Sequence, residues 1–288
     1  MTTDSPPAQV LVTDPLHEEA LQALRRHYDV TDQEVPPEEL PNLIEGFDAL
    51  IVRSRTKVTR DVLARATGLR VVGRAGTGVD NIDVEAATDA GILVVNAPGG
   101  SSQSVAELAV GLMLSLARHI PEANRTTKAG QWEKARFRGG ELAGKVLGLV
   151  GAGQIGSLVA QICQEFGMET IAYDPYLEPE AARERGIWLA SLEQVLERAD
   201  FVSVHAALTE ETHHMLSGPQ LARMKPSAYL INVARGQIVE EPALVEALQS
   251  GRIAGAGLEV FEREPPSRSA LLAMDNVIAT PHIGAATE

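Results

Sequence analysis

Residues 146–156 read VLGLVGAGQIG, and this stretch decides the fold. An apolar run typical of a strand leads directly into Gly151, Gly153 and Gly156, which have G-x-G-x-x-G spacing. The residues that follow, 155–166, predict an amphipathic helix. A strand, a tight glycine turn and a helix in this order are typical of a dinucleotide-binding sheet, in which the helix N-terminus faces a pyrophosphate.

An acidic residue at the end of the next predicted strand strengthens this interpretation. The next predicted strand, TIAYD, ends in Asp174. A carboxylate there accepts hydrogen bonds from the ribose hydroxyls of adenosine and repels a 2′-phosphate, which favours NAD over NADP. A chance glycine-rich turn is the ordinary alternative, and the combination of strand, helix and acid argues against it.

Short apolar runs alternate with amphipathic segments along the whole chain, which predicts α/β architecture with parallel sheets. Strands are predicted at 9–14, 28–30, 48–53, 70–73, 92–96, 146–150, 170–173, 201–204, 228–233, 253–260 and 276–280. A long helix is predicted over 101–119 and an irregular stretch over 120–144. Breaks near 97–101 and 281–283 indicate linkers between two Rossmann-like or flavodoxin-like domains.

Composition limits the class of protein. The chain has 288 residues, 44% hydrophobic and 22% charged, which is typical of a globular protein and excludes a disordered or coiled-coil chain. A formal net charge of −14 argues against a nucleic-acid partner but not against a small anionic ligand. No apolar run approaches the roughly 18–20 residues of a membrane span, and the N-terminus does not resemble a signal peptide. A cytoplasmic location is therefore expected.

The single cysteine, Cys163, excludes an intramolecular disulfide and a cysteine-based zinc site. It lies in a predicted helix, where a buried core position is expected. We expect no metal.

Three further segments stand at predicted strand ends: INVARGQIVEE, GLEVFEREPP and ATPHIGAAT. They present Arg235, Glu264 and His282. The arginine fork matches a carboxylate, and a histidine beside a carboxylate suits acid–base chemistry. Taken singly, these residues have ordinary interpretations as a surface cation, a solvated acid and a strand-end histidine. Their occurrence together beside a nucleotide turn favours catalysis.

These blocks, with VGRAGTGVDNID and NAPGGSSQSVAEL, resemble the D-isomer-specific 2-hydroxyacid dehydrogenases across nearly the whole chain, most closely the members that act on 3-phosphoglycerate. The resemblance implies an NAD-binding domain, 100–282, inserted into a substrate-binding domain, 1–99 plus a stub at 283–288. Family members continue into a helix that packs back on the substrate domain, and we expect no serine-responsive regulatory domain here.

The resemblance also implies roles. Hydride moves between substrate C2 and the nicotinamide, His282 exchanges the 2-hydroxyl proton, Glu264 raises the pKa of that histidine, and Arg235 binds the substrate carboxylate. Further residues are implied near NAD: Thr77, Gln154, Ile155, Ala206, Val233, Ala234, Glu259 and Gly284. The family usually has Asp at the position of Glu259, so the longer side chain must fold back or displace a neighbour.

A phosphorylated substrate needs cations in the first domain. Arg53 and Arg74 match substrate arginines of the family, and the backbone from Gly76 through Gly78 to Val79 is a candidate anion nest. Arg55 is expected to be a surface charge. The segment GQWEKARFRG, 130–139, resembles a loop that reaches a partner subunit's cleft, where Lys134, Arg136 and Arg138 would add charge and Trp132 would pack. A plain solvated loop is the alternative interpretation of these charges.

The expected reaction is NAD-dependent oxidation of 3-phosphoglycerate to 3-phosphooxypyruvate, the entry to serine synthesis. One alternative is a reductase of glyoxylate, hydroxypyruvate or another small 2-keto acid. The other is a non-enzymatic NAD-sensing scaffold, since corepressors of that kind share the fold. The apolar 101–119 helix and the resemblance predict a homodimer or homotetramer.

Overall fold

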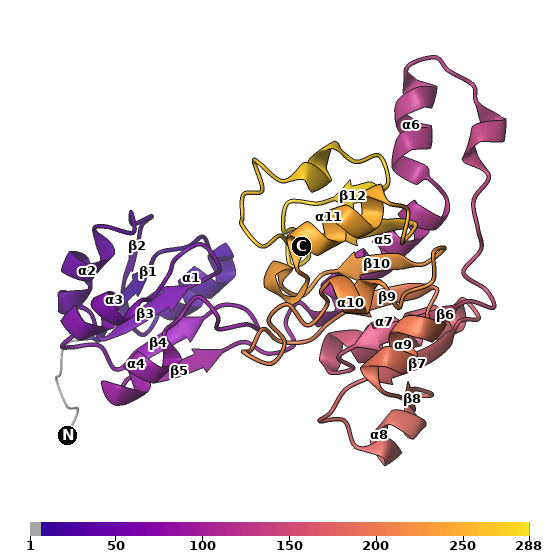
Figure 1. The fold of residues 1–288 in the computed structure, drawn as a ribbon. Coiled ribbons are helices and arrows are strands. Elements are labelled where there is room, and N and C mark those ends of the chain that lie inside the picture. The colour runs from indigo at the N-terminus through magenta and orange to yellow at the C-terminus, as the bar shows by residue number, and fades with distance from the viewer. Residues whose placement is uncertain (1–6, 288) are drawn as a thin grey trace. The chain divides into compact units, whose positions relative to one another are not determined.

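The computed structural model describes residues 7–287. Contacts divide the chain into two compact units, Met1–Ser101 and Ser102–Glu288, each built around its own parallel sheet (Figure 1). The described part of the expected C-terminal stub, 283–287, belongs to the second unit and not to the first. The physical reason is a hydrogen bond from the Gly284 amide to the Glu259 carboxylate inside that unit.

The first unit has a five-stranded sheet in the order β2-β1-β3-β4-β5. Its strands are β1 Gln9–Val12, β2 Asp29–Asp32, β3 Ala49–Val52, β4 Val71–Arg74 and β5 Leu93–Asn96. Its helices are α1 Glu18–Arg25, α2 Leu40–Leu43, η1 Ile44–Gly46, α3 Arg60–Arg65 and α4 Val84–Asp89. The strand order reverses between β1 and β3, and open α/β sheets bind ligands at the carboxyl ends of strands beside such a reversal.

The second unit has a seven-stranded parallel sheet in the order β12-β11-β10-β9-β6-β7-β8. Its strands are β6 Val146–Val150, β7 Glu169–Tyr173, β8 Trp188–Leu189, β9 Phe201–Val204, β10 Tyr229–Asn232, β11 Gly255–Leu258 and β12 Val277–Ala279. Counted within the unit, this is the doubly wound Rossmann order, and it reverses between β6 and β9. The predicted fold class, two parallel α/β domains, is confirmed.

Helices cover both faces of this second sheet. The helices of the whole unit are α5 Ser102–Ala117, α6 Ile120–Lys128, η2 Lys134–Phe137, α7 Gln154–Glu165, α8 Pro179–Glu184, α9 Leu192–Arg198, α10 Gly218–Leu221, η3 Gly236–Ile238, α11 Glu241–Gln249 and η4 Ala270–Ala273, of which α6 and η2 do not pack on the sheet. One core cluster joins α5 and α7 to the sheet, and another joins α9, α10 and α11 to it. Strands buried on both faces explain the unbroken apolar runs in the sequence.

The stretch 120–144 is not irregular as expected. It contains the helix α6 and the short η2, which form an arm of the second unit (Figure 1). Pro121 occupies the first turn of α6, where proline is tolerated, and Arg136 of η2 bonds back to Glu122 at 3.1 Å. The α6 sequence IPEANRTTK is mostly polar, so it lacks the apolar periodicity on which the prediction depended.

Within residues 7–287, the structure contains no helix that is both long and apolar enough to cross a membrane.

Candidate active site

The glycine turn between β6 and α7 has the shape that a dinucleotide requires. Gly151 has φ +90°, and a Cβ there would lie 2.8 Å from the Ala206 nitrogen. A Cβ on Gly156 would lie 2.3 Å from the Gly151 oxygen, so only glycine allows the helix to approach the strand end. A Cβ on Gly153 would meet no described atom within 4 Å, so this side of the turn is open to a pyrophosphate.

The first turn of α7 faces the same space. Gly153 is its N-cap, and no side chain of the described residues caps it. Gln154 and Ile155 are its first residues, so their backbone N–H groups stand at the positive end of a 12-residue helix. These observations fit the residues to the phosphates of NAD.

Asp174 follows β7, and its side chain lies beside this turn. Its Oδ2 accepts the Ala152 amide at 2.8 Å, and its Oδ1 accepts the amides of Tyr176 and Leu177 at 2.9 and 3.1 Å. A carboxylate has about four acceptor positions, so capacity remains for a ribose hydroxyl. Asp174 thus also holds the glycine turn in place.

His205, which the sequence analysis did not single out, follows β9 and packs under the same turn. Its Nε2 lies 2.8 Å from Ser203 Oγ, and among the described residues its buried Nδ1 has no hydrogen-bond partner. Burial lowers the pKa of His205 to about 3, so the imidazole is neutral at physiological pH. The neighbouring Ala206, predicted near NAD, directly faces Gly151.

The turn after β10 presents Arg235. Asn232, which is buried, donates from Nδ2 to the Arg235 carbonyl at 2.9 Å and accepts the Ala234 amide at 3.1 Å. Both ends of the turn 232–235 are therefore held by one amide side chain. Val233 is buried, and Ala234 accepts a hydrogen bond from Arg235 Nη1 at 2.7 Å through its carbonyl oxygen.

Glu264 and His282 come together from the loops after β11 and β12. His282 Nδ1 lies 2.8 Å from Glu264 Oε2, and the two side chains are 41% and 38% exposed. The other oxygen of Glu264 accepts the Phe261 amide at 3.2 Å. Holding Nδ1 against a carboxylate leaves Nε2 as the nitrogen that can exchange a proton with a ligand.

The pair has shifted proton affinities. Its hydrogen bond to Glu264 raises the pKa of His282 above its ordinary value, and the charges of Glu264 and Glu259 add to this. Partial burial alone raises the pKa of Glu264, but the hydrogen bond and charge of His282 outweigh it and the pKa is lowered. Arg235 lies near enough for its charge to lower both values. The three predicted catalytic residues are therefore neighbours in the second unit.

Glu259 is buried, and its side chain bonds to the segment around His282. Its buried carboxylate accepts the Thr280 hydroxyl and the Gly284 amide, and its carbonyl accepts the His282 amide at 3.2 Å. His282 has φ 54°, a left-handed conformation that is uncommon outside glycine. Glu259 thus bonds to the chain before, at and after His282, the residue with the left-handed conformation.

In the first unit, Arg53 follows β3 and Arg74 ends β4, where Val52 pairs with Arg74. Arg53 is exposed, and its Nη1 lies 3.5 Å from the Pro15 oxygen. Arg55 is more than a surface charge: it bonds the buried Asp14 at 2.9 Å and also contacts Glu34. Its role is structural, because it neutralises a buried carboxylate.

The anion nest is narrower than expected. The Gly76 amide already donates to the Arg74 oxygen at 2.8 Å. A Cβ on Gly76 would collide with the Arg74 guanidinium, which therefore folds over its own turn. Asn96 bonds the Thr77 carbonyl at 2.6 Å, and the amides of Thr77, Gly78 and Val79 are left as the candidate donors.

Of the arm residues, Lys134 begins η2 and is exposed, and Trp132 is 85% exposed. Arg136 does not add net positive charge as expected, because Glu122 and Glu133 pair with it at 3.1 and 3.0 Å. Arg138 is exposed.

A doubly wound sheet with this turn and this Arg–Glu–His cluster defines a dinucleotide-dependent oxidoreductase class. The comparisons with known proteins agree. Residues 110–284 match the family model described as the NAD-binding domain of the D-isomer-specific 2-hydroxyacid dehydrogenases. The chain belongs to this family, and the family's cofactor confirms the prediction of NAD.

Individual relatives are similar over nearly the whole chain. A D-3-phosphoglycerate dehydrogenase of Methanocaldococcus jannaschii is 51% identical, covering 97% of this chain and 54% of the relative. A hydroxypyruvate reductase of Thermotoga maritima is 46% identical, covering 97% and 92%. The TT0316 protein of Thermus thermophilus has a solved structure with TM-score 0.89 and 39% identity, covering 97% and 90%. The chain thus spans about half of the first relative and most of the other two.

Proposed function

We propose that the chain is an NAD-dependent dehydrogenase that oxidises 3-phosphoglycerate at C2 to 3-phosphooxypyruvate. The observation that carries the proposal is the His282–Glu264 pair beside Arg235, at the strand ends of a sheet with a dinucleotide turn. When bound, NAD supplies the hydride acceptor. The remaining roles are proposed for side chains of this chain.

The roles follow from the geometry. His282 in its neutral form accepts the 2-hydroxyl proton at Nε2 during oxidation and returns it during reduction. Glu264 stabilises the imidazolium and orients the ring. Arg235 binds the substrate carboxylate with its planar fork. In the first unit, Arg53, Arg74 and the amides of Thr77 and Gly78 are proposed to bind the phosphate, with Lys134 adding charge.

A second candidate function is reduction of hydroxypyruvate or glyoxylate. It is favoured by the Thermotoga maritima relative, which this chain covers almost completely. The two candidates share the catalytic cluster and differ in what the first-unit arginines bind. An unphosphorylated acid leaves Arg53 with little to contact.

A substrate panel tests the proposal. NADH formation is followed by absorbance with 3-phosphoglycerate, D-glycerate, D-lactate and glycolate, and consumption is followed with hydroxypyruvate and glyoxylate. The proposal predicts the highest kcat/KM, by about tenfold or more, for 3-phosphoglycerate; one such factor is about 1.4 kcal/mol of differential binding. A higher value for glyoxylate or hydroxypyruvate supports the reductase. No turnover of any acid contradicts both.

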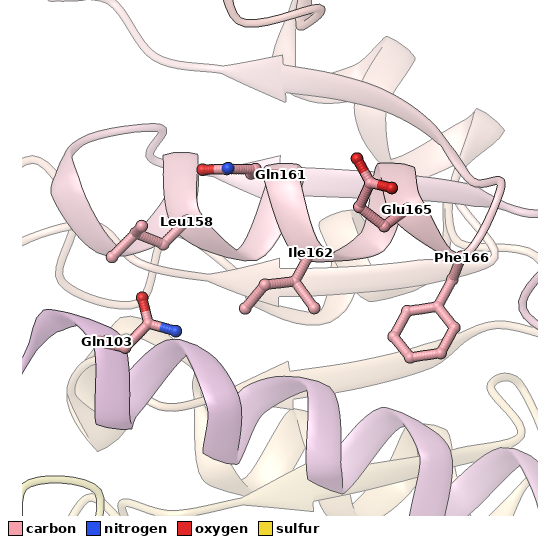
Figure 2. Close-up of a pocket in the computed structure, with 6 residues that line it drawn as sticks. All are labelled: Gln103, Leu158, Gln161, Ile162, Glu165 and Phe166. Atoms are coloured by element: carbon pink, nitrogen blue, oxygen red, sulfur yellow. The ribbon is translucent and has the colours of Figure 1, made fainter.

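We also propose that two copies associate through α5 and α7. Within one chain, a shallow hollow of about 290 Å³ lies between these two helices and is lined by Gln103, Leu158, Gln161, Ile162, Glu165 and Phe166. Figure 2 shows Leu158, Ile162 and Phe166 pointing toward α5, and Phe166 is 42% exposed. Light scattering should give a dimer for the wild type and a monomer for Phe166→Glu. A monomeric wild type contradicts this assembly.

A further inference from the structure

A second histidine–carboxylate pair lies beside the first. His214 Nε2 is 2.7 Å from Glu262 Oε1, and Glu262 stands two positions before Glu264 in the same loop. The same oxygen accepts the amide of Glu241, the first residue of α11, at 3.1 Å. One carboxylate therefore joins the loop after β9, the start of α11 and the loop that carries Glu264.

Further hydrogen bonds tie the loop after β9 to η3, and η3 to the loop that carries Glu264. The His214 amide donates to the Gln237 carbonyl at 2.8 Å, and Leu216 donates to Ile238 at 3.0 Å. Gln237 Nε2 in turn donates to the Glu262 carbonyl at 2.9 Å. Gln237 and Ile238, which accept these backbone bonds, lie just after Arg235 in the chain. The His214–Glu262 pair is therefore connected to the segment that follows Arg235 and to the loop that carries Glu264.

Gly236 shows how closely these backbones approach. A Cβ there would lie 1.9 Å from the Phe261 carbonyl carbon and 2.4 Å from the Glu262 nitrogen. The residue after Arg235 therefore rests directly on the start of the Glu264 loop. A shift of Glu262 would move Glu264 relative to Arg235, and with it the carboxylate that orients His282.

We propose that His214 and Glu262 are positioning residues, which hold Glu264 at a fixed place between Arg235 and His282. The inference deepens the proposed function and rests on it for its kinetic consequence. Neither residue is assigned contact with substrate or cofactor. Misplacing a reacting group by about 1 Å costs up to about 10² in rate, which is the scale of effect expected.

The test compares two substitutions at one position. His214→Leu removes the hydrogen bond to Glu262, and His214→Gln keeps a donor the same number of bonds from the backbone. His214→Leu should lower kcat about 10–100-fold with the KM for NAD within about twofold, and His214→Gln should recover most of the loss. His213→Leu is the matched control, since His213 is exposed and its ring lies 4.0 Å from that of His214 with a tilt of 32°. It should behave as the wild type.

A second readout does not need turnover. The His282 imidazole, which faces Glu264, Glu259 and Arg235, is titrated by NMR in histidine-labelled protein. His214→Leu should lower its pKa toward the ordinary value, and His214→Gln should not. If His214→Leu does not fold, Gln237→Ala replaces it, because it removes only the hydrogen bond to the Glu262 carbonyl. It should lower the pKa of His282 by less than the full shift toward the ordinary value. An unchanged titration in the folded variants, or equal losses in the Leu and Gln variants, overturns the positioning role. Absence of turnover in the wild type contradicts the proposed function instead.

Discussion

The Nδ1 atom of His282 lies 2.8 Å from Oε2 of Glu264, and this contact joins two loops that follow neighbouring strands. Each partner changes the proton affinity of the other: the pKa of His282 is raised and that of Glu264 is lowered. The pair therefore favours the charged form of each partner more than the separate groups would. A proton acceptor with a raised pKa is a stronger base once it is deprotonated, which suits removal of a hydroxyl proton.

The pH dependence of turnover should follow this pair. Oxidation needs neutral His282, so its rate should rise with pH through the raised pKa; reduction needs the protonated form and should fall through the same pKa. Glu264→Gln removes the charge that raises the pKa, so both limbs should move to lower pH and kcat should drop about 10-fold or more. Rates measured from pH 5 to 10 in both directions test this. If the pH–rate profiles of Glu264→Gln match those of the wild type, Glu264 does not raise the pKa of His282.

Two glycines of the turn should respond differently to alanine. Gly156→Ala puts a methyl 2.3 Å from the Gly151 oxygen and should lower the free energy of unfolding by about 1–3 kcal/mol, measured with urea. Gly153→Ala meets no described atom, so it should destabilise the fold much less than Gly156→Ala. It should nevertheless weaken NAD binding about tenfold or more, because the methyl projects where the backbone approaches pyrophosphate. Equal effects on stability would show that the turn is packed differently.

Cofactor choice should depend on Asp174. Asp174→Ala should weaken NAD and raise the NADP-to-NAD ratio of kcat/KM, since the carboxylate that accepts ribose hydroxyls is gone. It also leaves the Ala152, Tyr176 and Leu177 amides without their acceptor. Asp174→Asn is the control, because it keeps an acceptor without the charge that repels a 2′-phosphate. A ratio unchanged in both variants would place the ribose elsewhere.

Substrate choice should depend on Arg53. Arg53→Ala should raise the KM for 3-phosphoglycerate about tenfold or more and leave that for an unphosphorylated hydroxy acid within about twofold. Lys57→Ala removes an exposed cation nearby and should leave both unchanged. Arg55 is unsuitable as a control, because it pairs with the buried Asp14. Similar losses for both substrates would favour the reductase.

Much of the fold could be predicted from the sequence because buried parallel strands are recognisable apolar runs. The glycine turn was recognisable from its G-x-G-x-x-G spacing, and Asp174 from its place at the end of the next strand. The catalytic residues likewise follow predicted strands. The helix α6 was missed because its exposed residues leave no apolar period. The placement of 283–287 depends on the buried Glu259 carboxylate, whose contacts with Thr280 and Gly284 form only in the folded chain.

The supporting residues were harder to foresee. Asn232, His205 and the His214–Glu262 pair act through hydrogen bonds that depend on how the chain folds around them. Such partners depend on tertiary geometry, and a single polar residue in a sequence gives no sign of them. Asn232 had the clearest signal, as a polar residue that ends a buried strand just before Arg235.

The most direct measurement is NADH formation by the wild type and by His282→Asn, with 3-phosphoglycerate and saturating NAD. The account predicts measurable turnover for the wild type and a loss of about 10² or more in kcat for the variant, with the Kd for NAD nearly unchanged. Equal turnover by the two proteins would contradict the assignment of His282 as the proton acceptor.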